Sequence, residues 1–125
     1  MTIKEVSKKY GITPDTLRYY ERVGMIPPVH RTEGGIRNYT ESDLGWVELA
    51  LCMRNAGLPV EVMVDYLKLY REGDSTLKAR LQLLTEQKEV LIEQRKNIDA
   101  TIDRLNYKIS KYETAVKTGK LSWDE

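Results

Sequence analysis

The 125 residues suffice for one small domain with an appended element and exclude a multidomain enzyme. The composition, 41% hydrophobic and 31% charged, is typical of a globular protein, and no apolar run approaches the roughly 18 residues of a membrane span. The net charge of +1 conceals a basic first third, with seven Lys/Arg against four Asp/Glu in residues 1–40, which is the charge pattern of a DNA-binding module.

Two short helices separated by a glycine turn are predicted at the start of the chain. Thr2 and Glu5 have the spacing of a capping box, so a helix is expected over residues 3–10, and Gly11 ends it. Thr13 and Pro14 then begin a second helix over about residues 14–23. This order is the outline of a helix-turn-helix.

The second predicted helix carries side chains suited to reading DNA. A turn of about 100° per residue places Leu17 and Tyr20 on one face and Arg18, Tyr19 and Arg22 on the other. Guanidinium and phenol groups are suitable donors for phosphates and base edges. The alternative for such a face is a solvated helix surface without a partner.

The helical period breaks over residues 26–39. Gly34 and Gly35 can adopt the positive φ angles of a tight hairpin, and short β-leaning segments flank them, so we predict a β-hairpin wing here. Arg31, Arg37 and Tyr39 would lie along this wing.

Two further helices are predicted behind the wing. The spacing of Thr40 and Asp43 starts one that reaches about Ala56, with Leu44 and Val47 on its apolar stripe. Pro59 opens the next, over about residues 60–71. We expect both to complete a small core.

A ridge of apolar residues with a seven-residue period runs from residue 75 to residue 117, which predicts one long helix. Such a helix is about 60 Å long, too long for the small front domain to cover, so a second chain should cover the ridge and form a coiled-coil homodimer. The alternative is an ordinary long core helix. The predicted dimerisation residues are Leu77, Leu81, Leu84, Leu91, Ile98, Ile102, Leu105, Ile109 and Tyr112, with Val116 continuing the ridge.

Two basic residues on the ridge indicate the direction of pairing. Lys88 and Arg95 would each face their own copy in a parallel dimer, stacking two layers of like charge. In an antiparallel dimer they would lie near Leu105 and Ile98 of the second chain, where their stems could cover apolar surface. The predicted fold class is therefore mainly α: a winged helix-turn-helix over 1–73, an antiparallel coiled-coil dimerisation helix over 74–118, and a tail over 119–125.

Three segments carry a family resemblance: residues 17–26 (LRYYERVGMI), 35–39 (GIRNY) and 57–59 (GLP). With their mutual spacing, they resemble the MerR family of bacterial transcription regulators over about residues 1–70. The resemblance implies a winged helix-turn-helix, an antiparallel coiled-coil dimer, and a two-fold symmetric operator between promoter elements set too far apart. Bending and untwisting that DNA would let RNA polymerase engage both elements, so the polymerase is an indirect partner through the shared promoter.

The resemblance also assigns DNA contacts residue by residue. Thr16, Arg18 and Tyr19 fall where the second helix of the family meets the major groove. Trp46 stands where many relatives have a basic residue, which puts a DNA contact from the third helix in doubt. The full set of candidates is Lys4, Thr16, Arg18, Tyr19, Arg22, Arg31, Arg37 and Tyr39.

Cys52 is the candidate for sensing an effector. The metal sensors of the family resemble one another in carrying paired cysteines near the far end of the dimer helix, whereas no cysteine follows Cys52 here, so neither a metal nor a cofactor is expected. A short chain with one cysteine in the third helix resembles the AdhR/NmlR branch, implicated in responses to aldehydes and thiol stress. Alkylation or oxidation of Cys52 would then change the distance between the two reading heads, the DNA-binding domains (1–73) of the two chains in the dimer. The alternative is that Cys52 is only a small buried hydrophobic residue.

Two other functional classes can be distinguished from a transcription regulator. A DNA-architectural or recombination accessory protein could use the same winged module, but would bend double-stranded DNA without changing transcription. An enzyme is not expected, because one His and one Cys fall in no motif that unites a nucleophile, a base and an orienting group. Without a signal-like segment at the start of the sequence, we expect a cytoplasmic protein.

Overall fold

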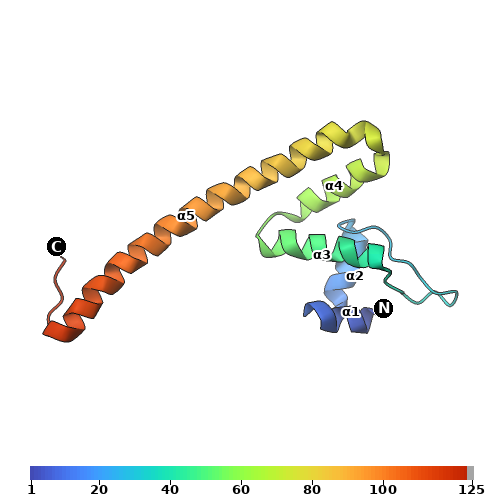
Figure 1. Cartoon of the computed structure of the whole chain (residues 1–125). Coiled ribbons are helices and arrows are strands. Elements are labelled where there is room, and N and C mark those ends of the chain that lie inside the picture. Colours follow the sequence, from blue (N-terminus) through green and yellow to red (C-terminus); the bar gives the residue numbers. More distant parts are fainter. Residues whose placement is uncertain (124–125) are drawn as a thin grey trace. The chain divides into compact units, whose positions relative to one another are not determined.

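The computed structural model describes residues 1–123, which form helices joined by short turns, except that a longer hairpin segment joins the second helix to the third (Figure 1). The predicted helices are confirmed to within two residues at each end. The chain divides into two compact units, Met1–Thr85 and Glu86–Glu125. The elements are α1 (Ile3–Tyr10), α2 (Pro14–Val23), α3 (Glu41–Asn55), α4 (Val60–Glu72), the 3-10 turn η1 (Asp74–Thr76) and α5 (Leu77–Thr118).

Side-chain caps fix where the first two helices begin and end. Thr2 and Glu5 form the predicted capping box, in which the Thr2 hydroxyl accepts from the Glu5 backbone N–H at 3.2 Å. The Thr13 hydroxyl accepts from the backbone of the third helical residue at 3.1 Å and so caps α2. Gly24 ends α2 at φ 84°, a left-handed conformation that costs glycine little. These caps fix the bounds of α2, the helix that carries the candidate DNA-reading side chains.

The core of the first unit is built from α1 to α4 and the base of the wing. Leu17 and Tyr20 are buried, as the helical period predicts, and on α3 the fully buried Val47 lies between the partly buried Leu44 and Leu51. The buried cluster consists of Val6, Leu17, Tyr20, Met25, Ile26, Val29, Tyr39, Val47, Ala50 and Met63.

The wing, residues 26–39, is an irregular hairpin and not the pair of short strands predicted from the sequence. Arg31 and Arg37 form one isolated antiparallel bridge, and no strand is found in residues 1–123. The turn is closed by hydrogen bonds from Thr32 N to Ile36 O (2.8 Å) and from Gly35 N to Thr32 O (2.9 Å). The strands fail to form because residues 32–36 are exposed and pack on nothing, and an isolated two-stranded pairing is marginal in water.

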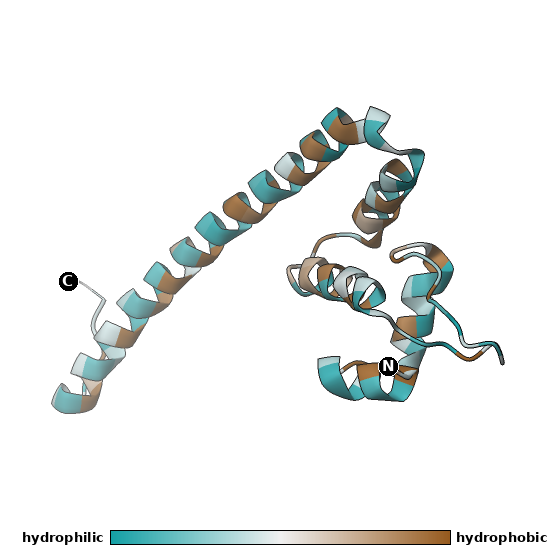
Figure 2. Cartoon of the chain, turned by 45° about the vertical axis from the view of Figure 1, so that its right-hand side comes forward, coloured by the Kyte–Doolittle hydropathy of each residue, from teal (hydrophilic) through white to brown (hydrophobic). Residues whose placement is uncertain are grey.

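α5 is a 42-residue helix without a buried residue. Brown apolar residues recur along its whole length between teal polar ones (Figure 2). Within residues 1–123 no helix, α5 included, is long and apolar enough to cross a membrane. Along the predicted ridge Leu91 is half-buried, and the exposed residues are Leu77, Leu81, Leu84, Ile98, Ile102, Leu105, Ile109, Tyr112 and Val116.

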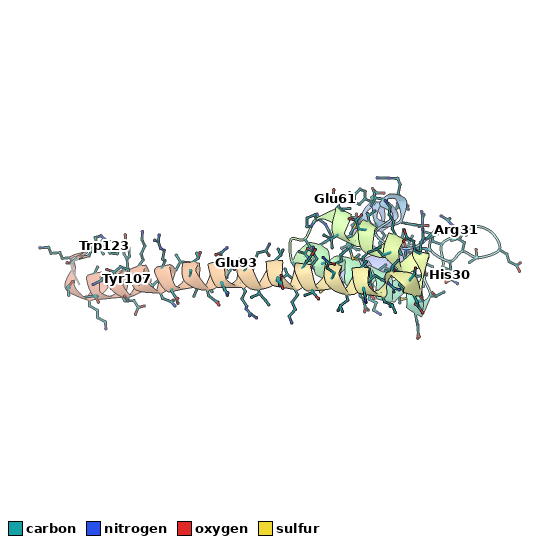
Figure 3. The ribbon with its side chains drawn as sticks, turned by 90° about the horizontal axis from the view of Figure 1, so that it is seen from above. His30, Arg31, Glu61, Glu93, Tyr107 and Trp123 are labelled. Carbon is teal, nitrogen blue, oxygen red and sulfur yellow. The ribbon has the colours of Figure 1, made fainter. Side chains whose placement is uncertain are left out.

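The residues after α5 fold back on its last turns. The Gly119 N–H donates to Ala115 O at 2.7 Å and ends the helix. The Trp123 ring then meets the Tyr112 ring edge to face, with centroids 5.8 Å apart, and it lies at the same end of α5 as Tyr107 (Figure 3). The predicted tail, 119–125, is thus packed on α5 over residues 119–123, and its last two residues lie outside the described part. The sequence predicts a division at 73/74 and 118/119 by expected function, into a DNA-binding part, a dimerisation helix and a tail. That division stays a prediction.

Candidate nucleic-acid interface

The outward face of α2 carries the candidate groups for reading DNA. Because Leu17 and Tyr20 are buried, Arg18, Tyr19 and Arg22 are left exposed. The guanidinium carbon of Arg22 lies 5.5 Å from the Tyr19 ring centroid, which is a cation–π distance. One exposed surface therefore presents two guanidinium groups and a phenol.

Arg18 is paired with a neighbour on its own helix. Its Nη1 donates to Asp15 Oδ1 at 2.8 Å, and the two side chains are 46% and 93% exposed. An ion pair as exposed as this contributes about 0–1 kcal/mol to stability, so little is lost when a phosphate or a base edge replaces Asp15. Nearby, the Thr16 hydroxyl lies 2.9 Å from the Thr13 hydroxyl, and Lys4 is exposed on α1.

Arg31 and Arg37 lie on the two legs of the wing, in different environments. Arg31 is exposed on the outgoing leg, next to His30 (Figure 3), and its Nη1 donates to Gly35 O at 2.8 Å. The Arg37 side chain is only 23% exposed, and its Nε donates to Glu21 Oε1 at 2.8 Å. Arg31 is thus held within the wing, whereas Arg37 is fixed to α2.

Tyr39, predicted to lie along the wing, is a core residue at the end of that segment. The side chain is 2% exposed and belongs to the buried cluster. Burial raises the pKa of the Tyr39 hydroxyl, which is also, within residues 1–123, a buried polar atom without a hydrogen-bond partner. A contact between Tyr39 and DNA stays a prediction, and in this conformation the hydroxyl is closed to solvent.

Two carboxylates that the sequence reasoning missed fasten the wing to the helices. Glu21 Oε2 accepts from Val29 N at 3.2 Å, in addition to the bond from Arg37. Asp43 Oδ2 on α3 lies 2.9 Å from His30 Nδ1 and accepts from the His30 backbone N–H at 3.3 Å. The sequence predicts Asp43 as part of a helix cap, but it gives no sign that Asp43 or Glu21 bonds the wing.

Cys52 lies on α3 and is exposed in the single chain, which does not favour the alternative of a buried hydrophobe. One turn earlier, Glu48 Oε1 accepts a hydrogen bond from the Tyr10 hydroxyl at 2.6 Å. Burial, together with this bond, raises the pKa of Tyr10 to about 12. Among residues 1–123 no group of three or more His, Cys, Asp or Glu side chains could hold a metal ion.

Trp46, which stands where many relatives have a basic residue, packs against aromatic rings of α4. Its ring meets the Tyr70 ring of α4 edge to face, with centroids 5.1 Å apart, and lies 6.0 Å from the Tyr66 ring. Trp46 therefore joins α3 to α4.

Comparisons with known proteins agree with this geometry. Residues 1–69 match the model of the MerR HTH family regulatory proteins. The chain is 52% identical over 93 residues to the HTH-type transcriptional regulator AdhR of Bacillus subtilis; the match spans 74% of this chain and 66% of AdhR, just under two thirds of that relative.

Two solved structures are similar over nearly the whole chain. A MerR family regulator from Listeria monocytogenes is 44% identical, with a TM-score of 0.89, covering 95% of this chain and 90% of that one. HiNmlR, described as a MerR family regulator lacking the sensor domain and bound to promoter DNA, is 32% identical, with a TM-score of 0.86, covering 95% and 94%. These relatives are transcriptional regulators and not enzymes. The chain is a DNA-binding transcriptional regulator, and it belongs to the MerR family of helix-turn-helix regulatory proteins.

Proposed function

We propose that the chain binds a two-fold symmetric promoter element as a homodimer and distorts that DNA to control transcription. The observation that carries the proposal is the exposed apolar ridge of α5, where leucines and isoleucines recur every seven residues along a 42-residue helix. Exposed apolar side chains in such a row favour a partner helix with the same period, and a second copy supplies one. Two copies related by a two-fold axis suit a palindromic site.

The direction of pairing follows from Lys88 and Arg95, both exposed on α5. Antiparallel pairing sets Lys88 beside the partner's Leu105 and Arg95 beside the partner's Ile98, so that no two like charges face each other. The same register brings Lys78 near the partner's Glu113, an attractive pair at each end of the coil.

Each reading head would contact DNA through α2 and the wing. Thr16, Arg18 and Tyr19 would enter the major groove, because an exposed helix face with hydrogen-bond donors is what base edges accept. Arg22 and Lys4 would add phosphate contacts beside that groove, and the two wing arginines would contact the adjacent backbone. HiNmlR, a similar protein, is described as bound to promoter DNA, which supports DNA binding by this chain.

The regulatory step would be a deformation of the promoter. A dimer with a fixed separation between its heads binds best to DNA bent and untwisted to match that separation, at an energetic cost that depends on sequence. Untwisting a long spacer would bring both promoter elements within reach of RNA polymerase. The polymerase would then respond to the chain through the shared DNA.

The experiment is DNase footprinting of the region upstream of the gene for this chain and of its neighbours, followed by transcription from the same fragment. We expect one protected palindrome, salt-sensitive binding, and a change in transcript level. Protection of a bent site without any change in transcription would favour the architectural alternative. Equal binding to random and promoter fragments would contradict the proposal.

The proposal extends to Cys52 as the effector-sensing residue, because its thiol is exposed and it lies on α3, in the same unit as α2 and the wing. Addition of the thiolate to an electrophilic carbon, such as that of formaldehyde, would add bulk on α3 and change the separation of the heads. Footprinting and transcription with and without formaldehyde test this. A C52S variant that still induces normally would leave Cys52 a structural residue only.

A further inference from the structure

Besides the core packing between the wing and α2, the Glu21 carboxylate of α2 forms hydrogen bonds with both legs of the wing. Its Oε1 accepts from Arg37 Nε at 2.8 Å on the returning leg, and its Oε2 accepts from Val29 N at 3.2 Å on the outgoing leg. The Glu21 side chain is 13% exposed, so water screens these bonds little, and an ionised acceptor makes them stronger than neutral ones. Glu21 thus joins both legs of the wing to α2.

This arrangement leaves part of the Arg37 side chain available. A guanidinium group has five N–H donors in a planar fork, and Glu21 engages the one on Nε. Within residues 1–123 no acceptor is found for the two terminal nitrogens, and the side chain retains 23% exposure. An arginine that is held at Nε and has free terminal nitrogens can bind an anion in a bidentate manner.

Glu21 also lies among the groups proposed to bind DNA. It directly precedes Arg22 on α2 and follows Arg18 by three residues, and all three side chains belong to the helix proposed for the major groove. A displacement of the wing relative to α2 would therefore separate the proposed base contacts from the proposed phosphate contacts. The bonds of Glu21 oppose that displacement.

We propose that Glu21 is a positioning residue for DNA binding: it orients the guanidinium of Arg37 toward a backbone phosphate and holds the wing in register with α2. The inference rests on the proposed DNA contacts of α2 and the wing. Glu21 acts through Arg37 and does not itself contact DNA, because a carboxylate beside a phosphate is repelled.

The proposal predicts that removing the Glu21 charge weakens DNA binding, whereas simple electrostatics predicts that it tightens binding. Removing an acidic side chain near DNA tightens binding when its charge is all that matters. If Glu21 positions Arg37, the change E21Q weakens binding although it removes a negative charge. Glu33, exposed at the tip of the wing, is the matched control, because E33Q removes the same charge without releasing Arg37.

The experiment measures binding of the full chain to a labelled duplex of random sequence over a series of salt concentrations, because a phosphate contact is independent of sequence. We expect E21Q and R37A each to weaken binding by about fivefold to tenfold and to lower the salt slope by about 1. In the R37A background, E21Q should add less than about twofold, since the group that it positions is already gone. E33Q should bind as the wild type does, or more tightly.

Binding by E21Q equal to or tighter than that of the wild type overturns the proposal. The proposal is also overturned if E21Q causes the same loss of affinity in the R37A chain as in the wild type, because that is the result expected if Glu21 is purely structural. Circular dichroism verifies that each variant is folded. Should E21Q unfold, E21D takes its place with the same expectation, because it keeps the charge but is one methylene too short to reach both legs. A wild-type chain that binds no duplex contradicts the proposed function instead, so the two failures are distinguishable.

Discussion

His30 Nδ1 lies 2.9 Å from Asp43 Oδ2, and this contact ties the base of the wing to the first turn of α3. The same oxygen accepts from the Thr40 backbone N–H at 2.9 Å, completing the capping box of α3. Asp43 is only 5% exposed. A buried carboxylate is costly unless it is hydrogen-bonded, so these donors make the burial of Asp43 tolerable, and the carboxylate in turn satisfies them.

Removal of the Asp43 carboxylate should destabilise the helix-turn-helix domain, residues 1–73. D43A leaves the N–H groups of Thr40 and His30 without their acceptor, and we expect the free energy of unfolding to fall by about 2–3 kcal/mol. The control is E41A, in the same turn but exposed, which should cost less than about 0.5 kcal/mol. Urea unfolding followed by circular dichroism measures both. Equal losses in the two variants would show that Asp43 has no special role.

The contribution of Asp43 should depend on pH. Burial acts to raise its pKa, but the hydrogen bonds from Thr40 and His30 outweigh burial and hold the pKa below its ordinary 3.8. A carboxyl with a lower pKa in the folded chain adds stability above its unfolded pKa and loses that stability as pH falls through the folded pKa. The stability difference between wild type and D43A should therefore be full at neutral pH and shrink below about pH 4. A difference that is unchanged at about pH 3 would contradict this.

The elements that the sequence predicts well are those whose signals are local. Thr2 and Glu5 are three residues apart, and that spacing is enough to predict the capping box that forms. Glu21 and Arg37 are sixteen residues apart, and nothing in their spacing marks them as partners. The sequence predicts strands in the wing that do not form, because strand pairing also depends on non-local packing, which residues 32–36 lack. For Tyr39, the sequence shows an aromatic ring at the end of the wing but not the side that it faces.

The hydroxyl of Tyr39 gives a direct test of whether this residue contacts DNA. Because it is buried without a partner in the described structure, Y39F should leave stability unchanged or raise it by up to about 1 kcal/mol. Y10F is the contrasting control, since it removes a hydroxyl that donates to Glu48 at 2.6 Å, and it should cost about 1 kcal/mol. If Y39F weakens DNA binding at unchanged stability, the hydroxyl becomes exposed in the complex and the original DNA-contact prediction holds.

Disulfide trapping can determine the direction of the dimer helices. In the proposed antiparallel register Leu84 faces the partner's Ile109, so L84C/I109C in a C52S background should form an intermolecular disulfide upon mild oxidation. L84C alone should stay monomeric on non-reducing gels, because antiparallel pairing sets the two copies of residue 84 far apart. A dimer band from L84C alone would establish parallel pairing and contradict the antiparallel arrangement.

Arg18 should contribute more to DNA binding than any exposed arginine away from α2. Its ion pair with Asp15 is exposed and easily exchanged, so the guanidinium is available to base edges at small cost. R18A should weaken binding to the footprinted site by about 1–3 kcal/mol and relax sequence preference at one position of each half-site. R71A, on the exposed surface of α4, removes the same charge and should change affinity little. D15N should tighten binding slightly, since it frees Arg18 and removes a negative charge near phosphate. Titrations of each variant against the palindrome and a scrambled duplex measure these effects. A loss in R18A that is equal for both duplexes would mean that Arg18 contacts phosphate and not bases.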